Sequence, residues 1–128
     1  MKIQAIEKKL QFPRNASNMK ETNLGSKKYS AGLLRVLLLS ELSAGENHGY
    51  ALARRLRIRS GQELQVAAGN LYPVLYKMEA DGLATSRWIE GGNGRFQKVY
   101  ALTDTGIQAA EPAVSEFIQL TKAMLTGF

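Results

Sequence analysis

The segment Gly91-Gly92-Asn93-Gly94, in the second half of the 128-residue chain, constrains its fold most strongly. It separates two short runs, 85–90 and 95–102, that are rich in β-branched and aromatic residues. Such runs favour strands, and a stretch of glycine and asparagine between them is typical of a hairpin turn. The sequence therefore predicts a two-stranded hairpin in a chain whose other segments carry helical patterns.

Two helices are expected before the hairpin region. Residues 30–42 are apolar around most of the helical circumference, which predicts a buried helix of about three turns. Residues 48–59 predict a second helix, with Asn47 as its N-cap and Ser60-Gly61 as its end.

A third helix is expected over residues 68–81. Leu71, Val74, Leu75 and Met78 follow the spacing of one buried helical stripe. Pro73 lacks the backbone N–H that a helix interior needs, so we expect a distorted or late start. Gly82 followed by Leu83 predicts a glycine-type helix end.

After the hairpin, Thr103 is a suitable N-cap for a last helix that reaches about Met124. Pro112 should kink this helix or split it in two. The order helix, helix, helix, strand, strand, helix predicts a mostly α, α+β fold. It is a winged helix-turn-helix with a two-stranded wing and an added C-terminal helix for dimerisation.

The first part of the chain has a different pattern. Ile3, Ile6 and Leu10 share one helical face that ends at Pro13, and a polar linker follows. A solvated tail would explain the composition equally well. We expect three regions: an extension over 1–29, a DNA-binding domain over 30–103 and a dimerisation helix over 104–128.

Composition excludes several kinds of chemistry. The chain has no cysteine, and His48 is its only histidine, which argues against disulfides, thiolate metal sites and histidine-based nucleophilic catalysis. No pair of carboxylates lies at helical spacing within an apolar patch. We therefore expect no enzyme, no metal and no cofactor. No apolar run is long enough to cross a membrane, and no secretory core is present, so a cytoplasmic location is expected.

The positive charge is unevenly distributed. The formal net charge is +6, with +5 in residues 1–29, +3 in 30–98 and −2 in 99–128. A basic chain suits a polyanionic partner, but much of this charge lies in the extension. Binding of RNA through the extension is one alternative, although this segment lacks interleaved aromatic residues. The case for DNA depends on how residues 30–98 are arranged.

The third helix has the layout of a recognition helix, whose first turns and outer face meet a DNA groove. Its acidic residues, Glu79 and Asp81, are confined to its far end. Its other outward residues suit phosphate or base contacts, and Gly69 would let the backbone approach closely. The predicted contacts on this helix are Gly69, Asn70, Tyr72, Tyr76 and Lys77.

The hairpin adds Arg87, Arg95 and Lys98, which suit phosphates or a minor groove. Trp88 is interpreted as the apolar anchor of this wing. The arginines of 54–59 are interpreted as a solvated helix end, with direct DNA contact as the alternative.

The last helix has a broader apolar stripe than a three-helix core needs. An excess of exposed apolar surface indicates an interface, and two-fold dimers are the commonest oligomers. We expect a homodimer whose recognition helices read half-sites about one duplex turn apart. The predicted dimerisation residues are Ile107, Val114, Phe117, Ile118, Leu120 and Met124.

Residues 31–110 resemble the PadR family of transcriptional regulators. The residues that carry the resemblance are His48-Gly49-Tyr50, Gly69 to Leu75, Glu79 to Leu83, Trp88, Arg95 to Lys98, Tyr100, Leu102-Thr103 and Gly106. The resemblance implies a dimeric winged-helix repressor that binds double-stranded operator DNA. It also implies release by a small-molecule effector, such as a phenolic acid or a drug.

Two departures from the family pattern motivate an alternative. Ala67-Ala68 and Asn70 stand where hydroxyl residues are common, and Gln97 stands where a second basic wing residue is common. The alternative is a winged-helix protein-interaction or ligand-sensing module without operator binding.

Overall fold

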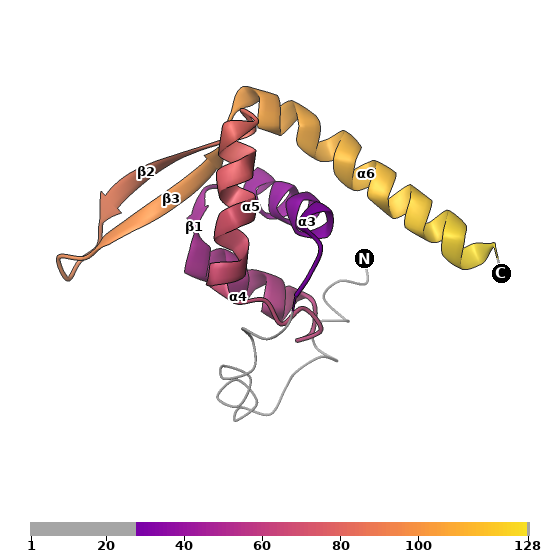
Figure 1. The fold of residues 1–128 in the computed structure, drawn as a ribbon, viewed down its shortest axis with the longest axis horizontal. Coiled ribbons are helices and arrows are strands. Elements are labelled where there is room, and N and C mark those ends of the chain that lie inside the picture. Colours follow the sequence, from indigo (N-terminus) through magenta and orange to yellow (C-terminus); the bar gives the residue numbers. More distant parts are fainter. Residues whose placement is uncertain (1–27, 128) are drawn as a thin grey trace.

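The computed structural model describes residues 28–127, so the helix expected over Ile3–Leu10 and its linker lie outside the described residues. Within these described residues, the fold consists of four helices and three short strands (Figure 1). In chain order they are α3 (Ala31–Ser43), β1 (Asn47–His48), α4 (Gly49–Arg59), α5 (Ala68–Ala80), β2 (Ala84–Glu90), β3 (Phe96–Leu102) and α6 (Asp104–Thr126). The mostly α, winged-helix fold expected from the sequence is confirmed.

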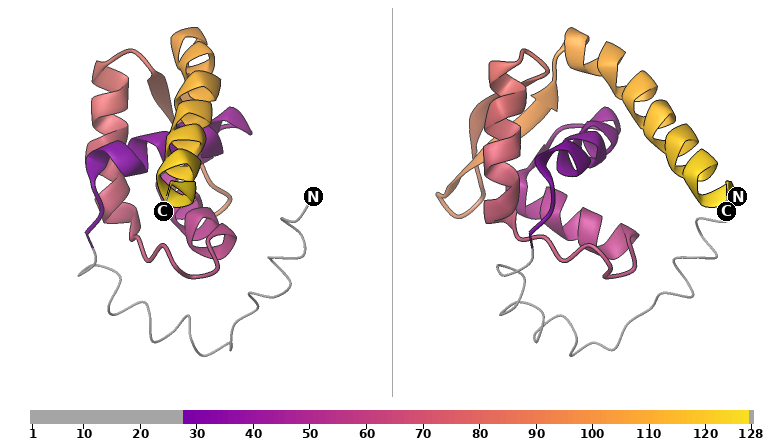
Figure 2. Two further views of the ribbon diagram at one scale, coloured as in Figure 1. Left: turned by 90° about the vertical axis from the view of Figure 1, so that its right-hand side faces the viewer. Right: turned by 45° about the vertical axis from the view of Figure 1, so that its right-hand side comes forward.

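The core lies where α3, α4 and α5 meet the inner end of the hairpin. Each of the three helices contributes buried leucines, and β3 contributes Tyr100, which is fully buried. The hairpin projects from this body on one side, and the far half of α6 extends away on another (Figures 1 and 2). The core therefore fixes α5 and the base of the hairpin relative to each other.

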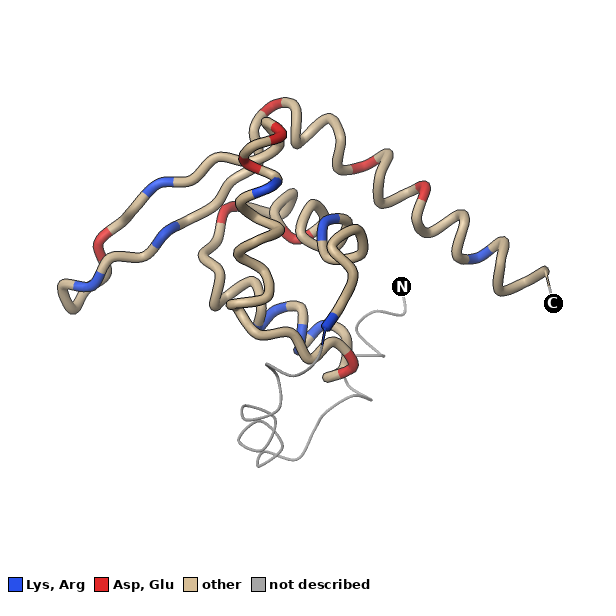
Figure 3. The backbone as a smooth tube through the Cα atoms, viewed as in Figure 1, with Lys and Arg blue, Asp and Glu red and all other residues tan. Residues whose placement is uncertain are grey.

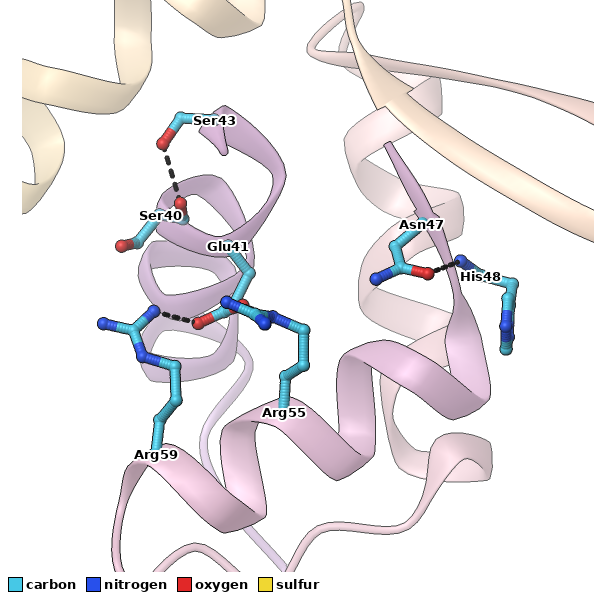
Figure 4. A network of polar contacts seen from close by, with 7 residues as sticks. All are labelled: Ser40, Glu41, Ser43, Asn47, His48, Arg55 and Arg59. Atoms are coloured by element: carbon cyan, nitrogen blue, oxygen red, sulfur yellow. Dashed lines mark hydrogen bonds and ion pairs between the residues drawn. The ribbon is translucent and has the colours of Figure 1, made fainter. Parts of the chain in front are cut away.

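The sheet has one strand more than the sequence predicts. Its order is β1-β3-β2, all antiparallel, with Asn47 opposite Tyr100 and His48 opposite Val99. Because Asn47 takes part in this strand, the N-cap of α4 is His48, whose Nδ1 accepts a hydrogen bond from the Ala51 N–H. The expectation of Asn47 as the cap is wrong; its side chain accepts a bond from the His48 N–H instead (Figure 4).

Both internal prolines are accommodated within continuous helices. The helix α5 begins at Ala68 despite Pro73, so the expected late start is wrong. The helix α6 runs unbroken through Pro112, so the expected split is wrong too. A proline deprives the carbonyl four residues earlier of its partner. These carbonyls belong to Gly69 and Gln108, which are exposed, so water can satisfy them.

A buried carboxylate joins α3 to α4. The side chain of Glu41 is only 3% exposed, and Arg55 Nε lies 2.7 Å from its Oε1. Arg59 donates to the other oxygen, and Figure 4 shows both arginines reaching Glu41 from α4. Removing one partner of such a pair leaves a costly buried charge. Two of the four arginines of α4 are therefore paired with a buried carboxylate, although their own side chains stay exposed, as a solvated helix end predicts.

The start of α6 is fixed by the turn between α5 and β2. Gly82 has a φ of +78°, and the Leu83 N–H bonds to the Met78 carbonyl 2.8 Å away, which completes the expected glycine-type helix end. Thr103 caps α6, and its hydroxyl donates to the Gly82 carbonyl at 2.6 Å. Gly106 lies against this turn, where a Cβ would be 2.0 Å from the Leu83 carbonyl oxygen.

We predict that Gly106→Ala lowers stability, because the new methyl group meets backbone that cannot move aside. Overpacking of this kind costs about 1–3 kcal/mol, which corresponds to a drop of roughly 5–20 °C in Tm for a domain of this size. Thermal unfolding by circular dichroism measures it. The control is Gly32→Ala in α3, where a Cβ meets nothing within 4 Å. Equal Tm values for the two variants would contradict the close packing of α6 on the turn.

Candidate nucleic-acid interface

The helix α5 separates a buried face from an exposed one, as the sequence predicts. Leu71, Val74, Leu75 and Met78 are all buried. The residues on the opposite face, Gly69, Pro73, Tyr76, Lys77 and Ala80, are all exposed. Asn70 and Tyr72 lie between the two faces and are half-buried. The helix thus has a continuous exposed face.

The first turn of α5 is also open. Its N-cap residue, Ala67, supplies no side-chain hydrogen bond, and a Cβ added at Gly69 would meet no other part of the protein within 4 Å. Arg54 and Arg57 of α4 line a cavity of about 320 Å³ beside Ala67 and Ala68. The start of α5 therefore combines backbone N–H groups with nearby cations, an arrangement that favours an anion. This position is compatible with direct DNA contact by Arg54 and Arg57, the alternative interpretation of the arginines of 54–59.

The hairpin face that meets α5 carries Lys98. Its ammonium lies 5.4 Å from the ring centre of Tyr76, 5.7 Å from that of Trp88 and 5.8 Å from that of Tyr100. Tyr76 in turn stacks on Tyr72, with ring centres 6.0 Å apart. Cation–π contacts of this kind hold the lysine in place without neutralising it.

The expectation that Trp88 is the apolar anchor of the wing is wrong, because 64% of its surface is exposed. The register explains the difference: Ser86 pairs with Tyr100, while Trp88 pairs with Lys98, further out along the hairpin. Tyr100 therefore reaches the core, whereas Trp88 does not. Its burial raises the pKa of the Tyr100 hydroxyl above the ordinary value of 10.0, and burial also raises the pKa of Tyr72.

The structure separates Arg87 from the other predicted contacts. Arg87 and Trp88 are consecutive in β2, so their side chains point to opposite faces of the hairpin. The guanidinium forms a two-point ion pair with Glu46, at 2.6 and 2.7 Å. This hydrogen-bonded pair lowers the pKa of the Glu46 carboxyl.

Lys77 lies towards the far end of α5. Its ammonium is 3.1 Å from Asp81 Oδ1, and Arg35 of α3 is 2.5 Å from Asp81 Oδ2. These two cations lower the pKa of Asp81, the arginine contributing most. Lys77 remains exposed, but part of its charge is balanced locally.

Four of the predicted contacts meet at a cleft between α5 and the hairpin, whereas Gly69 and Asn70 do not line it. Its volume is about 340 Å³. It brings together Tyr72 and Tyr76 from α5 with Arg95 and Lys98 from the hairpin. The other lining residues are His48, Tyr50, Trp88, Phe96 and Gln97. Lysines and arginines recur along the hairpin and on α4, whereas α6 carries few (Figure 3).

The predicted dimerisation residues lie along α6. Ile107, Phe117, Ile118, Leu120 and Met124 are exposed, and Val114 is half-buried. Ile107, Val114 and Ile118 also line a cavity of about 700 Å³ against Ser40 and Ser43 of α3. Among residues 28–127, no helix has both the length and the hydropathy of a membrane span.

Comparisons with known proteins agree on one family. The family described as transcriptional regulator PadR-like matches residues 38–112. Transcriptional regulator Rv3488 of Mycobacterium tuberculosis is 30% identical over 101 residues, which cover 79% of this chain and 91% of that protein. Transcriptional regulator YqjI of Escherichia coli is 32% identical over 83 residues, but these span only 38% of its length.

Solved structures show the same fold. A transcriptional regulator from Clostridium thermocellum matches with a TM-score of 0.66 and 25% identity, covering 76% of this chain and 90% of that one. Bacillus subtilis PadR, solved in complex with operator DNA, matches with a TM-score of 0.57 and 28% identity. That match covers 67% of this chain and 46% of the Bacillus chain.

We predict that Glu46→Gln lowers the Tm at neutral pH and has little effect in acid. The folded-state pKa of Glu46 lies below its ordinary value of 4.5, so the ion pair stabilises the fold above that value. This contribution is lost as the pH falls through the lowered folded-state pKa. Thermal unfolding of both proteins between pH 7 and pH 3 measures the difference. If the wild-type protein and Glu46→Gln differ in Tm by the same amount at pH 7 and at pH 3, Glu46 acts by packing instead of by its charge.

Proposed function

The chain belongs to the PadR-like family of transcriptional regulators, and from this premise we propose that it is a homodimeric repressor that binds operator DNA and is released by a small molecule. Its family and its relatives are regulators of transcription rather than enzymes. A role on DNA also fits the expected cytoplasmic location. Within this proposal, residues 30–103 bind DNA and residues 104–128 dimerise.

One observation carries the proposal: α5 hides its apolar stripe and turns its polar face outward beside the cations of the hairpin. A winged helix uses such a face to enter the major groove, while the wing contacts the flanking backbone. The complex of Bacillus subtilis PadR with operator DNA supports the same use of the related fold.

The proposed contacts divide by position. Gly69, Asn70, Tyr72, Tyr76 and Lys77 would face the major groove, and Arg95 and Lys98 would meet the phosphates or the minor groove. The Arg87 guanidinium is already paired with Glu46. It would contact a phosphate only if that ion pair broke.

The exposed apolar side chains of α6 support dimerisation. Leu120 is 59% exposed and Met124 is 66% exposed, on a helix whose far half has left the body of the domain (Figure 2). A second copy of α6 would cover them, and a two-fold axis would set two α5 helices for a palindromic operator. The cavity between α3 and α6 is large enough for a drug-sized effector, which supports release by a ligand.

We predict that the double variant Arg95→Ala, Lys98→Ala weakens operator binding about tenfold or more, because two phosphate contacts are lost. The slope of log affinity against log salt should become shallower by about 2. Fluorescence anisotropy measures both, with a duplex from the region upstream of the gene and a shuffled duplex. Lys122→Ala, a charge change on α6, is the matched control.

The same titrations separate the alternatives. Equal affinity for upstream and shuffled duplex would contradict operator recognition. Unchanged affinity of the double variant would favour the alternative of a winged helix that binds proteins or ligands.

We predict that Leu120→Ser combined with Met124→Ser shifts the dimer towards monomer by at least about tenfold, because burial of both side chains drives association. Sedimentation velocity over a range of concentrations measures the shift. Glu116→Gln, on the same helix, is the control. A dimer of unchanged stability would place the interface elsewhere.

A further inference from the structure

The cleft between α5 and the hairpin is more aromatic than contact with a duplex backbone requires. Tyr50 is 75% exposed, Trp88 and Phe96 are 64% each and Tyr76 is 51%. All four line the same cleft, and the ring of Tyr76 stacks on that of Tyr72, which also lines it. Large aromatic side chains left exposed together indicate a binding surface. Flat rings favour a flat partner, which can stack on them.

The charge of the cleft calls for an anion. No acidic residue lines it, while Arg95 and Lys98 both do. Among the described residues, neither cation has a carboxylate partner, and the contacts of the Lys98 ammonium are aromatic rings. These two side chains contrast with Arg55, Arg59 and Arg87, which are all paired. The cleft thus retains positive charge that an incoming anion can use.

Polar groups at the cleft can also form hydrogen bonds with the edge of a bound aromatic ring. Gln97 offers an amide donor and acceptor. His48 Nδ1 accepts from the Ala51 N–H, so the neutral ring carries its proton on Nε2 and can donate it. An aromatic ligand whose ring carries hydrogen-bond donors and acceptors would therefore make more contacts with the cleft than a hydrocarbon ring would.

We propose that this cleft binds an unpaired nucleotide, with its base stacked on the aromatic rings and its phosphate held by Lys98 and Arg95. Aromatic side chains that alternate with cations recognise single nucleotides in this way. A volume of about 340 Å³ admits one nucleotide rather than a duplex. Binding in the cleft does not depend on operator recognition. Its regulatory consequence, competition with the operator for Tyr76 and Lys98, rests on the proposed function.

The same chemistry has two sources, a free mononucleotide or a nucleotide within single-stranded DNA. The chain contains a single tryptophan, Trp88, and it lies in the cleft. Its fluorescence therefore reports directly on occupancy. We expect AMP and a short oligo(dA) each to quench it with saturation. An oligomer that binds at least tenfold more tightly per site identifies single-stranded DNA as the source; otherwise the free nucleotide is the source.

Fragments of the ligand test the two halves of the site. Adenosine and inorganic phosphate should each bind at least about tenfold more weakly than AMP, since each lacks one set of contacts. Benzoate offers an aromatic ring and an anion without a base edge. If benzoate binds as tightly as AMP, the assignment to a nucleotide is wrong, and the cleft is a site for aromatic acids.

Variants locate the binding. Phe96→Ala and Lys98→Met should each weaken AMP about tenfold, the first through stacking and the second through charge. Both side chains lie outside the buried core, and circular dichroism verifies folding. Ile58→Ala and Lys122→Met are matched controls outside the cleft. Absence of quenching, or equal AMP affinity in all four variants, would overturn the proposal, whatever the outcome of the operator titrations.

Discussion

The packing of α5 against α3, α4 and Tyr100 of β3 is the constraint on which the rest of the structure depends. Leu71, Leu75 and Met78 are fully buried, so the rotation of α5 about its own axis is fixed. That rotation determines which side chains face outward. Because Tyr100 belongs to the same core, the hairpin is held beside the outward face rather than elsewhere. Hydrophobic burial, which has no direction of its own, thus positions polar groups for recognition.

Net charge alone says little about where this chain presents its cations. Arg55 and Arg59 hold Glu41, Arg87 holds Glu46, and Arg35 shares Asp81 with Lys77. Local pairing therefore involves at least five of the nine basic residues in residues 30–98. By contrast, the aromatic surroundings of Lys98 leave its positive charge available at the cleft between α5 and the hairpin.

Much of the fold follows from local patterns. The buried stripe of α5, the turn at Gly91–Gly94 and the cap at Thr103 each depend on neighbours within a few residues, and each was predictable. Features that depend on distant partners were not. The strand β1 is two residues long and exists only through pairing with β3. Glu41 meets arginines 14 and 18 residues away, and Arg87 meets Glu46 across 41 residues.

The site shows the same division. The outward residues of α5 follow from helical periodicity, but the aromatic cleft forms only when α5, the hairpin and the start of α4 come together. Gly49 illustrates this: a Cβ there would lie 2.6 Å from the Tyr72 hydroxyl, so the glycine allows Tyr72 to pack over the start of α4. With Tyr72 held there, Tyr76 stacks beside it and faces Lys98. Gly49 therefore helps to shape the cleft. Its role depends on contact with Tyr72, which is distant in the sequence, so local patterns do not reveal it.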